Sequence, residues 1–237
     1  MIKVDKPNMA QKGTISVEKT GEVFFGVNVF GEKDKDVIYQ PVYTVKGLAG
    51  AVYEITADED IITPDGTLRY HKGDVVDTVT TDDEGFAKSK ELYLGKYTVV
   101  EIKAPNGMVI NNEKHSVELT YAGQDVAVTE TVTSFYNERQ KVKISLEKVL
   151  EQNDTFGIGT NDEIKNISFG LYAKEDIVSS SGTVIPAEGL IEIITLDENG
   201  TAIANTDLPF GSYYIKEIAT DEHYIPVSYT HLTLPTI

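Results

Sequence analysis

A lysine and a glutamate occupy positions where charged side chains are not expected. Alternate residues of a β-strand share a face, and in this pattern Lys19 shares its face with Ile15 and Val17. Glu101 shares its face with Val99 in the same way. Because an isolated buried charge costs several kcal/mol, each of these two side chains needs either access to water or a partner.

The same pair recurs in the second half of the chain. Lys148 shares a face with Ile144 and Leu146, and Glu217 follows Ile215 at the alternate spacing. Each half of the sequence therefore places one amine and one carboxyl group on what should be an apolar face.

Three readings of Lys19 and Glu101 are open. The two residues can lie at strand ends, where a lysine reaches water, they can form a buried ion pair, or they can react. A lysine amine that apolar neighbours desolvate becomes a nucleophile, and a carboxyl group in the same pocket can polarise a carboxamide and shuttle protons. The electrophile would be the side chain of Asn137. Attack on it would release ammonia and leave an isopeptide bond.

Other asparagines compete for the role of electrophile. Asn111 and Asn112 are alternatives to Asn137, although their surroundings are typical of a loop. The second half has no Asn after Glu217. The sequence therefore predicts at most one cross-link, with Lys148 left as a free amine.

Short β-strands must position these residues, because helical periodicity is almost absent. Alternating runs are separated by turn clusters, and this spacing is typical of a sandwich or barrel. The runs also repeat: Ile15–Lys19 matches Ile144–Lys148, and Leu94–Glu101 matches Phe210–Glu217. The chain is therefore a tandem array. The first copy is longer between Gly26 and Gly47, and we expect this insertion to be a loop.

Four segments follow from the repeats. We expect a linker over residues 1–11, a complete β-sandwich over 12–139 and a truncated one over 140–226. Residues 227–237 read like a translated DNA-library adapter, so we expect a non-native tail outside the fold. The alternative for this tail is a genuine polar strand.

Composition excludes several classes of function. The chain has 38 acidic and 21 basic residues and a net charge of −17, which argues against nucleic-acid binding. It has no Cys, hence no disulfide and no Cys-ligated metal. No apolar run is long enough to insert in a membrane. The scattered His residues form no metal triad, and no cofactor is implied.

Two acidic loops are weak candidates for calcium, Asp58–Asp60 with Asp65, and Asp82–Glu84. Neither has the spaced carboxylates that end in a bidentate Glu, so solvated turns are the better interpretation. No Ser or Thr has an identifiable base partner, and we expect no turnover enzyme.

The ordered set of motifs resembles the Cna-B-like (SpaA-like, prealbumin-like) repeats of Gram-positive surface proteins and pilins. It comprises the Glu-Lys end of the first strand, Gly47–Ile55, Leu94–Glu101, the Ala104–Gly107 turn and a closing strand with Asn. The resemblance covers about residues 12–226 and implies tandem all-β, immunoglobulin-like sandwiches, the second truncated.

The resemblance also implies roles. Lys19 would be the amine, Asn137 the electrophile and Glu101 the catalyst of a single autocatalytic cross-link, while Lys148 and Glu217 would form a partial second site. The implied function is a structural stalk or shaft module of an adhesin or pilin. It would be extracellular and attached to the cell wall, with neighbouring repeats as partners, and with signal and anchor outside this fragment.

Two other functions stay open. An adhesive module would bind a host or matrix ligand directly, and the Gly26–Gly47 insertion, with Phe30, Tyr39 and Tyr43, would be its contact loop. An accessory module of a carbohydrate-active enzyme would need an aromatic platform, and the chain has no Trp.

Overall fold

The computed structural model describes residues 9–31, 37–226 and 230–233, the last four by their backbone alone. These residues form β-strands and one short 3-10 turn, η1 (Glu163–Asn166). They divide into two compact units. The first unit comprises residues 9–22 and 45–140, and the second comprises 23–31, 37–44, 141–226 and 230–233. The all-β fold class predicted from the sequence is confirmed.

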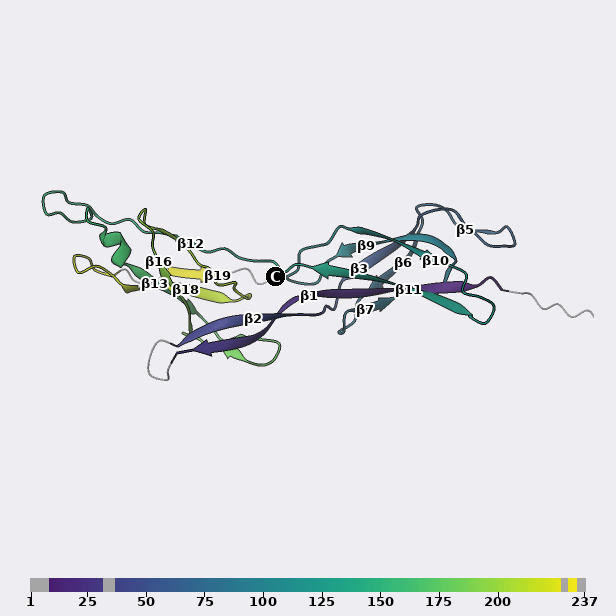
Figure 1. Ribbon diagram of the computed structural model, residues 1–237, viewed down its shortest axis with the longest axis horizontal. Coiled ribbons are helices and arrows are strands. Elements are labelled where there is room, and N and C mark those ends of the chain that lie inside the picture. Colours follow the sequence, from purple (N-terminus) through teal and green to yellow (C-terminus); the bar gives the residue numbers. More distant parts are fainter. Residues whose placement is uncertain (1–8, 32–36, 227–229, 234–237) are drawn as a thin grey trace, which may run out of the picture. The chain divides into compact units, whose positions relative to one another are not determined.

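The first unit has two layers (Figure 1). One is an antiparallel sheet in the order β10, β9, β3, β6, with bounds Lys114–Leu119, Gly95–Lys103, Val52–Ala57 and Val75–Thr80. The other is centred on the first part of β1, paired with β11, β7 and β8, with bounds Lys12–Phe30, Val128–Asn137, Phe86–Lys88 and Leu92–Tyr93. A short ribbon of β4 (Ile61–Ile62) and β5 (Leu68–Tyr70) completes the unit.

Alternation of apolar and polar residues explains these strands. Along β3, Tyr53, Ile55 and Ala57 are buried, while the residues between them are partly exposed. Along β1, Ile15 and Val17 are fully buried and pack in the same core. One face of each strand therefore supplies the core and the other meets solvent.

The first and last strands of this unit are neighbours. Strands β1 and β11 run parallel, with Lys19 opposite Phe135 and Gly21 opposite Asn137. Parallel neighbours need a long connection between them, and nearly the whole first unit lies between these two strands.

The second unit repeats this pairing. Strand β13 lies between β16 and β18, as β3 lies between β6 and β9, with bounds Ser168–Ala173, Leu190–Thr195 and Ser212–Ala219. Strand β12 (Ser145–Glu147) pairs with β17 (Thr201–Ile203), as β1 pairs with β7. A ribbon of β14 (Ile177–Val178) and β15 (Val184–Ile185) matches β4 and β5.

The predicted loop between Gly26 and Gly47 is instead a β-hairpin, so that prediction is wrong. Strand β1 continues to Phe30, and β2 (Ile38–Gly47) runs beside it. Residues 23–31 and 37–44 belong to the second unit, where apolar side chains of the hairpin pack against its core. The predicted boundary at 139/140 therefore omits an earlier segment that joins the second unit.

The predicted tail also contributes a strand. Residues 230–233 form β19, antiparallel to β18, which differs from the expectation that 227–237 stay outside the fold. An unpaired strand edge offers backbone donors and acceptors to any extended segment. Residues 227–229 and 234–237 lie outside the described residues, and the adapter origin of the tail stays a prediction.

Candidate functional site

Three predicted site residues meet inside the first unit. Lys19, Glu101 and Asn137 come from β1, β9 and β11, and each is only 1% exposed. The side chains of Lys19 and Glu101 have no exposed area at all. This excludes the strand-end reading, in which the lysine would reach water.

The polar side-chain atoms of the three residues all contact one another. Lys19 Nζ lies 3.1 Å from Glu101 Oε1 and donates a hydrogen bond to Asn137 Oδ1. Asn137 Nδ2 lies 2.9 Å from each Glu101 oxygen and donates to the carboxylate. The carboxylate thus contacts both the amine that would attack and the amide nitrogen that would leave.

The register of β11 turns Asn137 inward. Phe135 and Asn137 are buried, whereas Val132 and Tyr136 are 53% and 45% exposed. This is the regular alternation of a strand. The pairing of β11 with β1 continues without a register shift, so this alternation brings Phe135 and Asn137 to the core face together.

Aromatic rings enclose the lysine amine. The ring centres of Tyr53 and Phe135 lie 5.9 Å and 6.0 Å from Lys19 Nζ. His115 stacks on Phe135 with ring centres 3.9 Å apart. Two ring faces near a desolvated ammonium attract it, and they also exclude water from the site.

Burial sets the electrostatics of the site. Desolvation lowers the pKa of Lys19, and the hydrogen bond and negative charge of Glu101 oppose this shift in part. Burial, followed by the charge of Glu101, raises the pKa of Tyr53. The site therefore favours a neutral amine more than water does.

Asn111, which the sequence offered as an alternative electrophile, contacts Glu101 through its backbone and not through its carboxamide. Its backbone N–H donates to Glu101 Oε2 at 2.7 Å, while its Nδ2 donates to the carbonyl of Tyr136 at 3.2 Å. Its Oδ1 accepts from the backbone N–H of Glu113. Asn111 thus holds the carboxylate of Glu101, whereas Asn137 presents its carboxamide to Lys19. Asn112 is exposed.

The backbone of Lys19 is fixed from both sides. Its N–H donates to the carbonyl of Gly85 at 2.7 Å, and its carbonyl accepts from the N–H of Leu48 at 3.0 Å. Gly85 has φ +86°, and a Cβ there would lie 2.3 Å from the Lys19 carbonyl oxygen. The close approach of Gly85 to Lys19 has no signature in the sequence.

The second unit brings Lys148 and Glu217 together. Lys148 Nζ lies 3.1 Å from Glu217 Oε2, with the two side chains 16% and 1% exposed. In the described part of this unit, β12 pairs with β17 alone. No described strand takes the place beside β12 that β11 takes beside β1.

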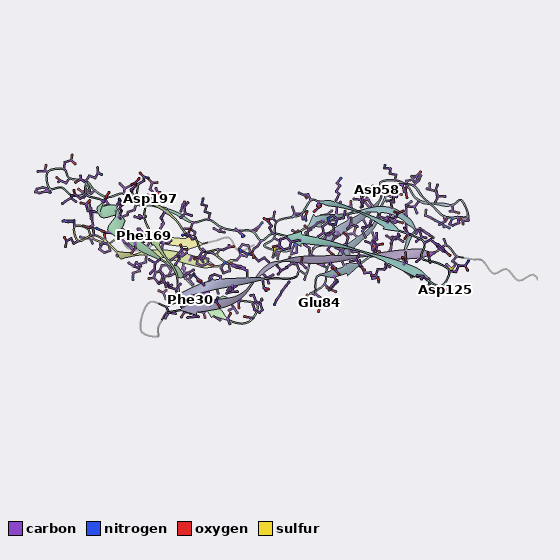
Figure 2. The ribbon with its side chains drawn as sticks, viewed as in Figure 1. Phe30, Asp58, Glu84, Asp125, Phe169 and Asp197 are labelled. Atoms are coloured by element: carbon purple, nitrogen blue, oxygen red, sulfur yellow. The ribbon has the colours of Figure 1, made fainter. Side chains whose placement is uncertain are left out.

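No metal centre emerges from the described residues: they contain no group of three or more His, Asp or Glu placed to hold an ion. Asp58, Glu84 and Asp197 lie in loops and turns outside the strands (Figure 2). Among the described helical segments, none is long and apolar enough to cross a membrane.

The sequence and the structure both have known relatives. Residues 41–133 match the family model described as SpaA, prealbumin-like fold domain. The "Trypsin-resistant surface T6 protein" of Streptococcus pyogenes serotype M6 is 27% identical over 139 residues, which cover 57% of this chain and 24% of that protein.

Two solved structures give the structural comparison. "The Bacillus anthracis TIE protein" superposes with a TM-score of 0.56 at 21% identity, covering 94% of this chain and 31% of that one. The shaft pilin SpaA of Lactobacillus rhamnosus GG covers 94% of both chains at 14% identity, with a TM-score of only 0.35. The first likeness supports the fold, and the second is too distant to support an argument. The chain spans about a quarter of the T6 protein and about a third of the TIE structure.

Proposed function

We propose, from the match of residues 41–133 to the SpaA prealbumin-like fold model, that the chain is a structural stalk or shaft module of a Gram-positive cell-surface adhesin or pilin. The module would be extracellular, attached to the cell wall through its parent protein, and in contact with neighbouring repeats. One observation carries the proposal: the buried contact of Lys19, Glu101 and Asn137.

The three residues contain everything that an isopeptide bond requires. A proton passes from Lys19 Nζ to the Glu101 carboxylate, which leaves a neutral amine beside the carboxamide of Asn137. The amine nitrogen attacks Asn137 Cγ, while Glu101 supplies a proton to Nδ2. The Cγ–Nδ2 bond breaks and ammonia leaves, the Glu101 carboxylate takes the second proton from Nζ, and an Nζ–Cγ amide remains. The reaction needs no oxidant and no cofactor, and it occurs once per chain.

The product would close a large covalent loop. Lys19 and Asn137 are 118 positions apart in the sequence. By analogy with a disulfide that closes a loop of this size, the stabilisation is about 4 to 5 kcal/mol. A chain without Cys would gain in this way a cross-link that resists reduction, which suits a load-bearing surface module.

Intact-protein mass spectrometry of the folded chain tests the proposal. We expect a mass lower than the sequence mass by one ammonia, and fragments joined through Lys19 and Asn137. Lys19→Met should restore the full mass, whereas the matched variant Lys148→Met should still lack one ammonia. A folded wild-type chain with its full mass would refute the cross-link.

The alternative function, an adhesive module, was based on the Gly26–Gly47 insertion as an exposed contact loop. Two of its three aromatic residues instead make contacts within the second unit. Tyr39 packs against the core of the second unit, and the Tyr43 hydroxyl donates to the carbonyl of Asp207 at 3.0 Å. Phe30 is 51% exposed. Loss of host-cell or matrix binding after Phe30→Ser would favour the adhesin, and unchanged binding would favour the shaft.

A further inference from the structure

The hairpin at residues 23–44 has a structural role that its place in the sequence does not suggest. Its described parts, residues 23–31 and 37–44, are called here the clasp hairpin. They are inserted in the sequence of the first unit but fold as part of the second. In Figure 1 they are the end of β1 and the strand β2.

Side-chain packing holds the clasp hairpin on the second unit. Phe24, Val27 and Tyr39 pack against the core cluster that contains Leu171, Ile194 and Ile215. Val29 and Phe30 are more than half exposed. The first part of this β1 segment and Tyr39 are therefore attached to this core, while the end of β1 faces solvent.

Hydrogen bonds add to this attachment. The backbone N–H groups of Ser180 and Ser181 donate to the carbonyls of Phe24 and Phe25, both at 3.1 Å. Strand β2 pairs in parallel with β16 through Ile38 and Leu190. The clasp hairpin thus contacts both the edge of β16 and the turn that follows β14.

The clasp hairpin is close in sequence to the candidate cross-link. It begins four residues after Lys19 and ends four residues before Leu48, and the backbones of these two residues share a hydrogen bond of 3.0 Å. Every residue of the hairpin falls between Lys19 and Asn137 in the sequence. A bond between these two residues gives tension a covalent path that omits residues 20–136, and hence omits the hairpin.

From this topology we propose that the clasp hairpin stabilises the second unit and that the Lys19–Asn137 bond keeps the hairpin out of the path of tension. Without the bond, tension along the chain runs through residues 20–44 and pulls the hairpin from the second core. With the bond, the hairpin stays in place while tension passes from residue 19 to residue 137. The second part of this proposal rests on the proposed cross-link, and the first part does not.

Hydrogen exchange tests the clasp itself. The double variant Phe24→Ser/Tyr39→Ser should exchange at least about tenfold faster in β13, β16 and β18, because local opening follows lost apolar packing. The matched variant Val29→Ser/Phe30→Ser, at the exposed end of β1, should exchange like the wild type. Unchanged protection of the second unit in the first variant would overturn the clasp.

A milder variant covers the case in which the double substitution disturbs both units. Tyr43→Phe removes only the hydroxyl that donates to the Asp207 carbonyl. It should speed exchange in the second unit, by less than the double variant, and leave β3 and β9 unchanged. Equal effects on both units, or none on the second, would count against the clasp.

Single-molecule pulling tests the path of tension. Because the chain has no Cys, Met9→Cys and Pro226→Cys provide unique handles. The second unit should unfold at lower force when Asn137→Ala is added, and Phe24→Ser/Tyr39→Ser should lower the force only in the cross-linked chain. Equal unfolding forces with and without Asn137→Ala would overturn this part.

Mass spectrometry of the same samples distinguishes a failure of the proposed cross-link from a failure of the proposed clasp. A wild-type chain with its full mass refutes the proposed cross-link and with it the shielding from tension. Hydrogen exchange still decides on the clasp in that case, because its contacts do not depend on the bond.

Discussion

The two units contain the same Lys–Glu pair at the same distance, in different surroundings. Lys19 and Lys148 each lie 3.1 Å from their carboxylates. Lys19 has no exposed side-chain area, whereas 16% of the Lys148 side chain is exposed. The difference is a strand: β11 covers Lys19 and brings Asn137, and no described strand stands in its place beside β12.

The comparison distinguishes a partly exposed ion pair in the second unit from the proposed cross-link site in the first. The distance between amine and carboxylate is a property of the pair and is the same in both units. Water exclusion and the carboxamide come from the closing strand. Burial lowers the pKa of Lys19, so in the proposed reaction the strand that carries the electrophile would also help to activate the nucleophile.

The largest expected effect comes from removing the electrophile. Asn137→Ala should abolish the mass loss and destabilise the first unit by about 4 to 5 kcal/mol, because the closed loop is lost. Calorimetry should show one transition shifted to lower temperature. Asn112→Ala, an exposed neighbour of the rival Asn111, is the control and should shift neither. An unshifted transition in Asn137→Ala would contradict the cross-link.

Removing the proton shuttle should slow the reaction without removing a reactant. Glu101→Gln should reduce the rate of ammonia loss by about 100-fold to 10,000-fold, the usual contribution of general acid–base catalysis. A time course of intact mass after synthesis measures this rate. The equivalent Glu217→Gln should leave the rate unchanged, and a similar loss in both variants would point to a folding defect.

The reaction should also depend on pH in a defined direction. General acid–base catalysis needs a proton at the site, so the rate should fall by about tenfold per pH unit once Lys19 has lost its proton. Burial lowers the pKa of Lys19 from its ordinary 10.5, so the alkaline fall should begin below the pH at which an exposed lysine titrates.

This pH dependence can be measured on chains collected in denaturant straight after cell-free synthesis. Dilution into buffers between about pH 5 and about pH 11 starts folding, and the mass then reports the extent of reaction. A rate that rises continuously through the titration range of an exposed lysine would contradict an activated Lys19.

The smallest effect is expected in the second unit. Lys148→Met/Glu217→Leu replaces its ion pair with apolar side chains and should change stability by no more than about 1 kcal/mol, because such replacements are often nearly neutral. The matching Lys19→Met/Glu101→Leu variant should lose the cross-link and about 4 kcal/mol with it. Hydrogen exchange resolved by unit measures both. A large loss in the second unit would show that its pair is a structural element in its own right.

Strand periodicity predicted the fold class and the residues that meet at the site. Ile15, Val17 and Lys19 share a buried face, as the alternation indicated. The position of Asn137 was harder, because nothing local in β11 distinguishes the inward face. Its pairing with β1 decides this, and pairing between residues 118 positions apart leaves no local pattern.

The hairpin shows where sequence comparison of the two copies fails. A length difference between repeats locates an insertion, but it says nothing of what the insertion packs against. Val27 and Tyr39 lie in the segment predicted as a loop, yet with Phe24 they pack in the second core, against residues more than a hundred positions later. The same limit applies to Gly85, whose close approach to the Lys19 carbonyl exists only in the fold.

The clasp hairpin also determines where the chain can be cut for recombination or cloning without damaging the second unit. A cut at 140/141 separates two stretches of sequence that look like independent repeats, but the second would lose Phe24, Val27 and Tyr39 from its core. Recombination or cloning at that point would transfer an incomplete domain with an uncovered apolar surface. A piece that runs from residue 23 or earlier to residue 233 would keep the clasp hairpin with its core, whereas 141–233 alone would not, and the two repeats are therefore engineered most safely as one piece.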